Sequence, residues 1–196
     1  MIKKNKVYII AEAGVNHNGS LSKALKLIEI AKKCGADAVK FQLFDKDEQI
    51  SKIAPSAPYQ KEKTKKKNML QMASTYDFSW KDHIKLKKKC DKIKIDYMAS
   101  CFDSKSVDFY LDKIKGKVMK IASSEIDNLR LLKYINKRCN KVILSTGMAN
   151  LEEIKKAVKT LKNVKFLTIL QCTSVYPASI NELNLNVIKT LKKMFK

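Results

Sequence analysis

Charged and hydroxyl-bearing side chains recur where short apolar runs of this sequence end. The first run, residues 7–12, finishes in Glu12 and leads into a polar loop. Carboxylates can move protons, while ammonium and hydroxyl groups together bind anions such as phosphate. The candidates along the chain are Glu12, Asn16, His17, Lys40, Gln42, Ser100, Lys120, Ser123, Ser124, Glu125, Ser145, Thr146, Gly147, Gln171, Thr173, Ser174 and Tyr176. This set suits a doubly anionic substrate that undergoes proton transfer.

Lys40 and Lys120 are the most informative candidates because each interrupts an otherwise apolar run. An unpaired ammonium would be costly to desolvate there, so an anion must meet each of them. One explanation is a structural ion pair with Glu12 or Glu125. The other is a bound phosphate or carboxylate, with the Ser145 hydroxyl among the further donors. The residues themselves leave both explanations open.

The histidines and cysteines give weaker predictions. His17 could be a ligand, a general acid, or a substrate-orienting or structural residue, whereas His83 lies in an amphipathic pattern and is expected at the surface. The five cysteines form no CxxC pair, so we expect free, buried thiols. Cys101 follows a strand, but no histidine or carboxylate is obviously paired with it for nucleophilic catalysis.

Alternating strands and helices must position these residues. Hydrophobic periodicity predicts strands over residues 7–12, 38–43, 95–101, 117–122, 141–146 and 165–171. It predicts helices over residues 21–34, 79–92, 104–115, 127–138, 151–162 and 185–195. Strict alternation implies a parallel sheet with right-handed crossovers, whose strand ends converge on one crevice.

Local patterns refine the limits of these elements. Ser20 and Asp127 suit helix N-caps, and Gly35 and Gly116 stand where a left-handed residue would end a helix. The one irregular connection, residues 44–78, follows the second strand and should overhang the same crevice. We expect it to be a lid or a binding loop, or a mobile segment in its lysine-rich part.

Length and charge narrow the function classes. A chain of 196 residues with 45% apolar content favours one domain over residues 1–196. The formal net charge is +22, but only Arg130 and Arg138 are arginines, so we expect no specific nucleic-acid binding and a general attraction for anionic metabolites. Neither a long apolar run nor a secretory signal is present, which favours a cytoplasmic protein without a membrane partner.

Five segments resemble the sialic acid synthase family in order and spacing. They are IAEAGVNHNG at residues 10–19, VKFQ at 39–42, KIASSE at 120–125, ILSTGM at 143–148 and QCTSVYP at 171–177. The resemblance covers essentially the whole chain. Residues 57–60 and 148–151 are most similar to the legionaminic acid branch.

The resemblance implies an α/β fold, a TIM (β/α)8-type barrel, and a defined reaction. Members condense phosphoenolpyruvate with an N-acyl hexosamine, either N-acetylmannosamine or 2,4-diacetamido-2,4,6-trideoxymannose, to a nine-carbon sialic or legionaminic acid and phosphate. It implies catalytic roles for Glu12, Glu125 and Lys40. It implies substrate binding by Lys120, Ser123, Ser145, Thr146, Gln42, Ser174, Tyr176, Asn16 and His17, with Tyr176 in the sugar pocket.

The resemblance also implies a divalent metal, Mn²⁺ or Mg²⁺, whose two histidine ligands lie in the family at the ends of strands seven and eight. We predict about six βα units here, so we expect a truncated barrel without those ligands, those strands or the C-terminal antifreeze-like domain. A homodimer or a complementing C-terminal chain would complete the site. The alternative function is a catalytically inactive, truncated protein that binds anions or serves assembly.

Overall fold

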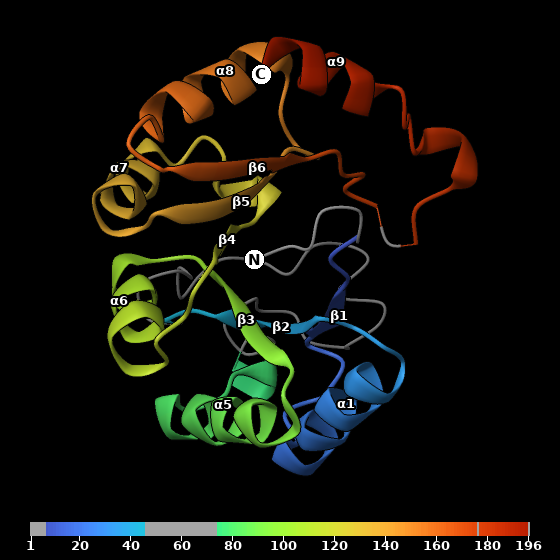
Figure 1. Ribbon diagram of the computed structural model, residues 1–196, viewed down its shortest axis with the longest axis vertical. Helices are drawn as coiled ribbons and strands as arrows, with labels where there is room; N and C mark the ends of the chain where they lie inside the picture. Colours follow the sequence, from blue (N-terminus) through green and yellow to red (C-terminus); the bar gives the residue numbers. More distant parts are fainter. Residues whose placement is uncertain (1–6, 46–73, 176, 196) are drawn as a thin grey trace. The chain divides into compact units, whose positions relative to one another are not determined.

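The computed structural model describes residues 7–45, 74–175 and 177–195. The chain divides into two compact units, Met1–Gly116 and Lys117–Lys196, and each is described by itself (Figure 1). Both units contain three parallel strands connected through helices. The predicted alternation of strands and helices is therefore confirmed, while one domain over residues 1–196 stays a prediction.

The first unit begins with β1 and ends in a π-helical turn. In order, it contains β1 (Ile10–Gly14), α1 (Leu21–Lys33), β2 (Ala38–Leu43), α5 (Trp80–Ile93), β3 (Asp96–Cys101), α6 (Ser104–Asp108) and the π-helical η1 (Phe109–Lys113). Strand β2 pairs in parallel with β1 on one side and β3 on the other. Most of the segment predicted to be a lid or binding loop lies outside the described residues.

The second unit repeats the pattern with a short first strand. It contains β4 (Met119–Ile121), the 3-10 turn η2 (Ser123–Glu125), α7 (Leu129–Arg138), β5 (Lys141–Ser145), α8 (Leu151–Thr160), β6 (Phe166–Leu170), the 3-10 turn η3 (Ile180–Glu182) and α9 (Val187–Met194). Strand β5 pairs in parallel with β4 and β6. No helix in the described ranges combines the length and apolar character that crossing a membrane requires.

Helices begin where a side chain satisfies their first amides. Ser20 caps α1 as predicted, accepting a hydrogen bond from the Lys23 amide at 3.3 Å. The predicted N-cap at Asp127 is wrong, because Asn128 caps α7 by accepting from the Leu131 amide. The Asn128 side-chain oxygen reaches the amide three residues further on, so α7 begins at Leu129, one residue later than a cap at Asp127 would give.

The end of η1 differs from the prediction at Gly116. The left-handed residue is Lys115, with φ 58°, rather than Gly116. Glycine is required at 116 for another reason, because a Cβ there would lie 2.1 Å from the Tyr110 ring. Gly35 adopts the predicted left-handed conformation, with φ +84°.

Side chains of the first unit alternate between two faces of its sheet. Helices α1 and α5 lie on one face (Figure 1). The rings of Phe41 and Tyr97 point to that side and stack with their centroids 5.7 Å apart. Lys40, Gln42 and Ser100 fall in the alternate positions and therefore belong to the opposite, polar face.

His83 contradicts the expectation of a surface position. Only 2% of it is exposed, and its Nδ1 lies 2.7 Å from the Tyr97 hydroxyl. Burial lowers the pKa of His83 to about 4. The lysines of α5 obscured this position, yet His83 continues the buried stripe of Leu86 and Cys90 at spacings of three and four residues.

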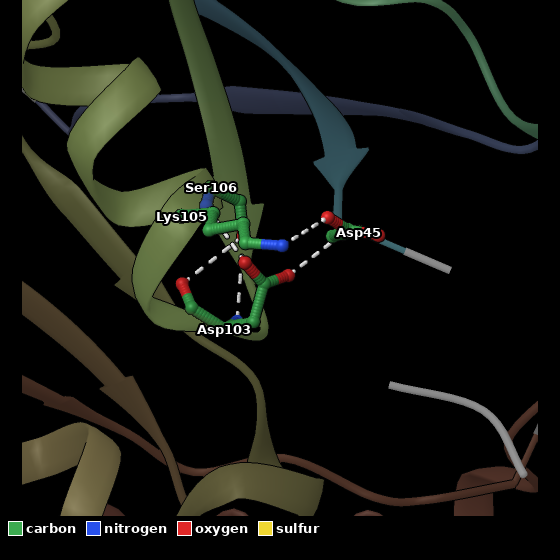
Figure 2. Close-up of polar contacts among 4 residues, drawn as sticks. All are labelled: Asp45, Asp103, Lys105 and Ser106. Carbon is green, nitrogen blue, oxygen red and sulfur yellow. Dashed lines mark hydrogen bonds and ion pairs between the residues drawn. The ribbon is translucent and has the colours of Figure 1, made fainter. Parts of the chain in front are cut away.

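A polar network joins the C-terminal ends of β2 and β3 (Figure 2). Asp103 caps α6 by accepting the Ser106 amide at 2.7 Å, and it also accepts the Asp45 amide at 2.8 Å. The Lys105 ammonium lies 3.1 Å from the Asp45 carboxylate. The network thus anchors the chain just after β2, the strand that carries Gln42. It was missed from sequence, although the Asp-x-x-Ser spacing is an N-cap pattern.

We expect the chain to become less stable as the pH falls from about 7.5 to about 4.5. The unfolded chain protonates His83 near pH 6.5, but the folded chain does so only near pH 4, so protons favour unfolding within this window. Each pKa unit corresponds to about 1.4 kcal/mol, so protonation of His83 should lower the free energy of unfolding by about 2–3 kcal/mol across this window. Urea unfolding at the two pH values measures the loss.

The control for this pH dependence is His83→Gln. The glutamine can accept a hydrogen bond from Tyr97 but cannot bind a proton in this range. Its free energy of unfolding should therefore depend less on pH than that of the wild-type chain. The same loss in both proteins would contradict the assignment to His83.

We also expect Asp103→Ala to lower the free energy of unfolding by about 1–2 kcal/mol, because α6 loses its cap and the Asp45 amide loses its acceptor. Asp103→Asn should lie between this variant and the wild type, since its one oxygen keeps the cap and its amide nitrogen cannot accept from Asp45. Urea titrations at neutral pH give the order. Wild-type stability of Asp103→Asn would refute the link to Asp45.

Candidate functional site

Glu12 and Lys40 form an ion pair on the polar face of the first unit. The two residues stand opposite each other in the β1–β2 register. The Lys40 side chain is 13% exposed and that of Glu12 is 50% exposed. The Lys40 ammonium also lies 3.5 Å from the Ser100 hydroxyl on β3. The structure thus shows the ion pair of Lys40 with Glu12, and anion binding by Lys40 stays a prediction.

Strand β1 begins three residues later than predicted and runs past Glu12 to Gly14. Glu12 pairs with Lys40 and Gly14 with Phe41, so Ala13 is the extra residue of a β-bulge. Gly14 has φ +49°, and a Cβ there would lie 3.2 Å from Glu12 Oε1. The glycine leaves room for the carboxylate as the chain turns into the loop.

The loop after β1 contains an exposed Asn16 and a buried His17. The His17 ring stacks on Phe78, with centroids 4.1 Å apart, and its Nδ1 accepts a hydrogen bond from the Gly19 amide at 3.1 Å. Burial lowers the pKa of His17, against a smaller opposing effect of the Gly14 backbone. His17 thus stabilises its own loop. Direct contacts of Asn16 and His17 with a substrate stay predictions.

Lys120 is buried on β4 of the second unit. Its ammonium donates hydrogen bonds to the Ser145 hydroxyl at 2.6 Å and to the Ile121 carbonyl at 2.8 Å. Lys120 is 6% exposed and Ser145 is 7% exposed. The structure brings these two predicted binding residues into direct contact. An ammonium held by a hydroxyl on a neighbouring strand is suited to bind an anion.

Glu125 is a buried carboxylate in the turn that follows β4. It accepts hydrogen bonds from the Asn128 amide group at 2.9 Å and from the Ser124 hydroxyl at 3.3 Å. Asn128 therefore orients Glu125 and caps α7 at the same time. Asn128 was not predicted from the sequence, because the pattern favoured Asp127 as the N-cap of α7. Ser123, at the start of the turn, is half-buried.

The loops after β5 and β6 approach each other closely. Thr146 donates to the Leu170 carbonyl at 2.7 Å. A Cβ on Gly147 would lie 2.7 Å from the Ser174 hydroxyl, so glycine permits this approach. Tyr176 lies outside the described residues. A cleft of about 620 Å³ opens beside these loops, with Thr146, Gly147, Asn150, Gln171, Cys172 and Val187 among its lining residues.

The described thiols and histidines hold neither a nucleophilic site nor a metal site. Cys101 is fully buried, and Cys34 and Cys172 depart from the expectation of burial. Within residues 7–45, 74–175 and 177–195, no three His, Cys, Asp or Glu side chains lie together as a metal centre would need. These residues therefore do not fit the divalent metal that the resemblance implies.

Comparisons with known proteins agree with the motifs. The NeuB family matches residues 27–196. The chain is 47% identical to the N,N'-diacetyllegionaminic acid synthase of Campylobacter jejuni, over 97% of this chain and 58% of that protein. It is 38% identical to the Legionella pneumophila synthase of the same name, over 96% of this chain and 55% of that protein.

A solved structure shows the same fold. It is the N-acetylneuraminic acid synthetase of Leptospira borgpetersenii in complex with citrate, 34% identical, with a TM-score of 0.84 over 97% of this chain and 62% of that chain. The expected TIM-barrel-type fold is confirmed. The chain spans somewhat more than half the length of the curated relatives it matches. The parallel strands, with lysines among their apolar residues, agree with this similarity. The chain therefore belongs to the NeuB family.

Proposed function

We propose that this chain serves an enzyme that condenses phosphoenolpyruvate with an N-acyl hexosamine and releases phosphate. The observation that carries the proposal is the buried contact between Lys120 and Ser145 in a chain of the NeuB family. Its product would be a nine-carbon sialic or legionaminic acid. A cytoplasmic location, a divalent metal held outside the described residues, and a homodimer or complementing C-terminal chain belong to the same proposal.

Lys120 and Ser145 are the groups that would bind the anionic part of phosphoenolpyruvate. The Lys120 ammonium donates to the Ser145 hydroxyl and to the Ile121 carbonyl. When the Ser145 hydroxyl turns to a phosphate or carboxylate oxygen, both groups can donate to the same anion. Charge-assisted hydrogen bonds of this kind are the stronger ones in proteins. Ser123 stands nearby in the chain as a further donor.

Glu12 and Lys40 would handle protons in the proposed condensation. The reaction forms a bond between the methylene carbon of phosphoenolpyruvate and the sugar aldehyde carbon. Water adds to the former enol carbon, whose bond to the phosphate oxygen breaks. The aldehyde oxygen must gain a proton, which an ammonium can donate, and the water must lose one, which a carboxylate can accept. The half-exposed Glu12 carboxylate and its partner Lys40 supply both groups.

Within the N-acyl hexosamines, we propose 2,4-diacetamido-2,4,6-trideoxymannose as the acceptor in preference to N-acetylmannosamine. The support is the similarity to the Campylobacter and Legionella relatives, both N,N'-diacetyllegionaminic acid synthases. Gln42 on the polar face of β2 and Ser174 in the loop after β6 are exposed side chains that could contact the substrates.

We expect the chain to bind phosphoenolpyruvate and Lys120→Met to weaken the binding by about 10–100-fold, the effect of losing a hydrogen bond from a charged group. Ser145→Ala should weaken it by a smaller factor. Isothermal titration calorimetry measures the affinities. Lys141→Met is the matched control, because Lys141 is exposed at the first position of β5. Equal affinity of the Lys120→Met and wild-type chains would contradict the assignment.

Turnover needs a separate experiment. The chain would be supplied with the part of the Campylobacter synthase that it does not match, together with phosphoenolpyruvate, Mn²⁺ and either acceptor sugar. We expect phosphate release, faster with the diacetamido sugar. Binding of phosphoenolpyruvate without release for any hexosamine would support the catalytically inactive anion-binding alternative instead.

A further inference from the structure

Four ring side chains form a buried column on the helix side of the first unit. The aromatic column consists of His17, Phe78, His83 and Tyr97. His17 stacks on Phe78 at 4.1 Å, Phe78 meets His83 edge to face at 6.0 Å, and His83 Nδ1 lies 2.7 Å from the Tyr97 hydroxyl. The column therefore runs without a break from the loop after β1 to strand β3.

The aromatic column stands directly behind the polar face. Phe41, next to Lys40 in β2, has its ring centroid 5.7 Å from that of Tyr97 and 6.2 Å from that of His17. Tyr97 precedes Met98, which is the register partner of Lys40. Because strand side chains alternate between faces, these rings pack against the strands that carry Lys40 and its register partner on their other face.

At its other end, the column fixes the loop that follows Glu12. The His17 Nδ1 accepts the Gly19 amide, and the backbone of Gly14 contacts the same ring. The His17 ring therefore contacts both ends of the loop segment 14–19. Gly14 is also the residue against which the Glu12 carboxylate lies.

We propose that His83 and Tyr97 are positioning residues, which hold His17 through Phe78 and so fix the loop beside the Glu12–Lys40 pair. The effect of this positioning on catalysis rests on the proposed condensation. The positioning of His17 itself is independent of that reaction, because it depends only on contacts within the aromatic column.

The protonation states agree with this role. The titratable groups that face His83 are Tyr97 from β3, His17 from the β1–α1 loop and Asp82 from α5 itself. Burial lowers the pKa of both histidines and raises that of Tyr97 well above its ordinary value. The neutral Tyr97 hydroxyl can then donate to Nδ1 of a neutral His83. A proton on that nitrogen would remove the acceptor and put a charge against Phe78.

The test compares Tyr97→Phe with Tyr8→Phe. Both variants lose one tyrosine hydroxyl of the same unit, but the Tyr8 hydroxyl donates to Asp96, where β3 begins, at 2.7 Å. Nitrogen NMR of the imidazoles reports the His17 tautomer. The wild type and Tyr8→Phe should carry the His17 proton on Nε2, and Tyr97→Phe should show a mixture of tautomers. The fluorescence of Trp80, the single tryptophan, verifies that each variant is folded.

In the complemented enzyme, Tyr97→Phe should lower kcat by about tenfold with little change in KM, because the loop is misplaced while the substrate contacts remain. Tyr8→Phe should match the wild type. If Tyr97→Phe does not fold, His83→Gln and His83→Leu give the same comparison, with the glutamine preserving the His17 tautomer and kcat better because it can accept from Tyr97.

The outcomes separate this inference from the proposed function. A single His17 tautomer in folded Tyr97→Phe, or in His83→Leu, would overturn the positioning role. A mixture of tautomers with unchanged kcat would overturn its catalytic consequence. A wild-type enzyme that releases no phosphate would refute the proposed condensation, and the NMR comparison would still decide whether the column positions His17.

Discussion

The cost of removing an ammonium group from water is the constraint on which the strands of both units depend. Lys40 and Lys120 each stand where a strand would otherwise carry an apolar residue, and the two ammonium groups have different partners. Lys40 lies against the Glu12 carboxylate, whereas the Lys120 ammonium is held by a hydroxyl and a carbonyl. The identity of the neighbouring strand residues follows from this requirement, because Glu12 and Ser145 must face the same side as their lysines.

Strand alternation connects the reactive groups to the packing behind them. In β2, Lys40 and Gln42 share the polar face, while Val39, Phe41 and Leu43 are buried on the other. The same backbone therefore carries the polar side chains and the packing rings one residue apart. In the positioning role proposed above, a change in the packing rings would reach the polar face through the hydrogen-bonded strand that both share.

Sequence reasoning predicted the features that local pattern determines. The alternation of strands and helices, the Ser20 cap and the placement of Lys120 within a buried strand all follow from periodicity and from helix-capping chemistry. It failed at His83, because lysines on both sides hid a buried stripe whose partner Tyr97 lies on another element. It also failed at Gly116, where contact with the Tyr110 ring, rather than backbone conformation, requires glycine. Both failures involve a ring contact, which at His83 comes from another element and at Gly116 from the turn just before it.

The two candidate carboxylates, one in each unit, have environments that suit different tasks. Glu125 is buried and held by Asn128 and Ser124, so its orientation is fixed before any substrate arrives. Glu12 is half exposed, and its ion-pair partner among the described residues is Lys40, so part of its carboxylate stays open to solvent. In the proposed condensation, a carboxylate that receives a proton from water must change partners during turnover. Glu12 meets that requirement, and Glu125 is better suited to orient neighbouring groups.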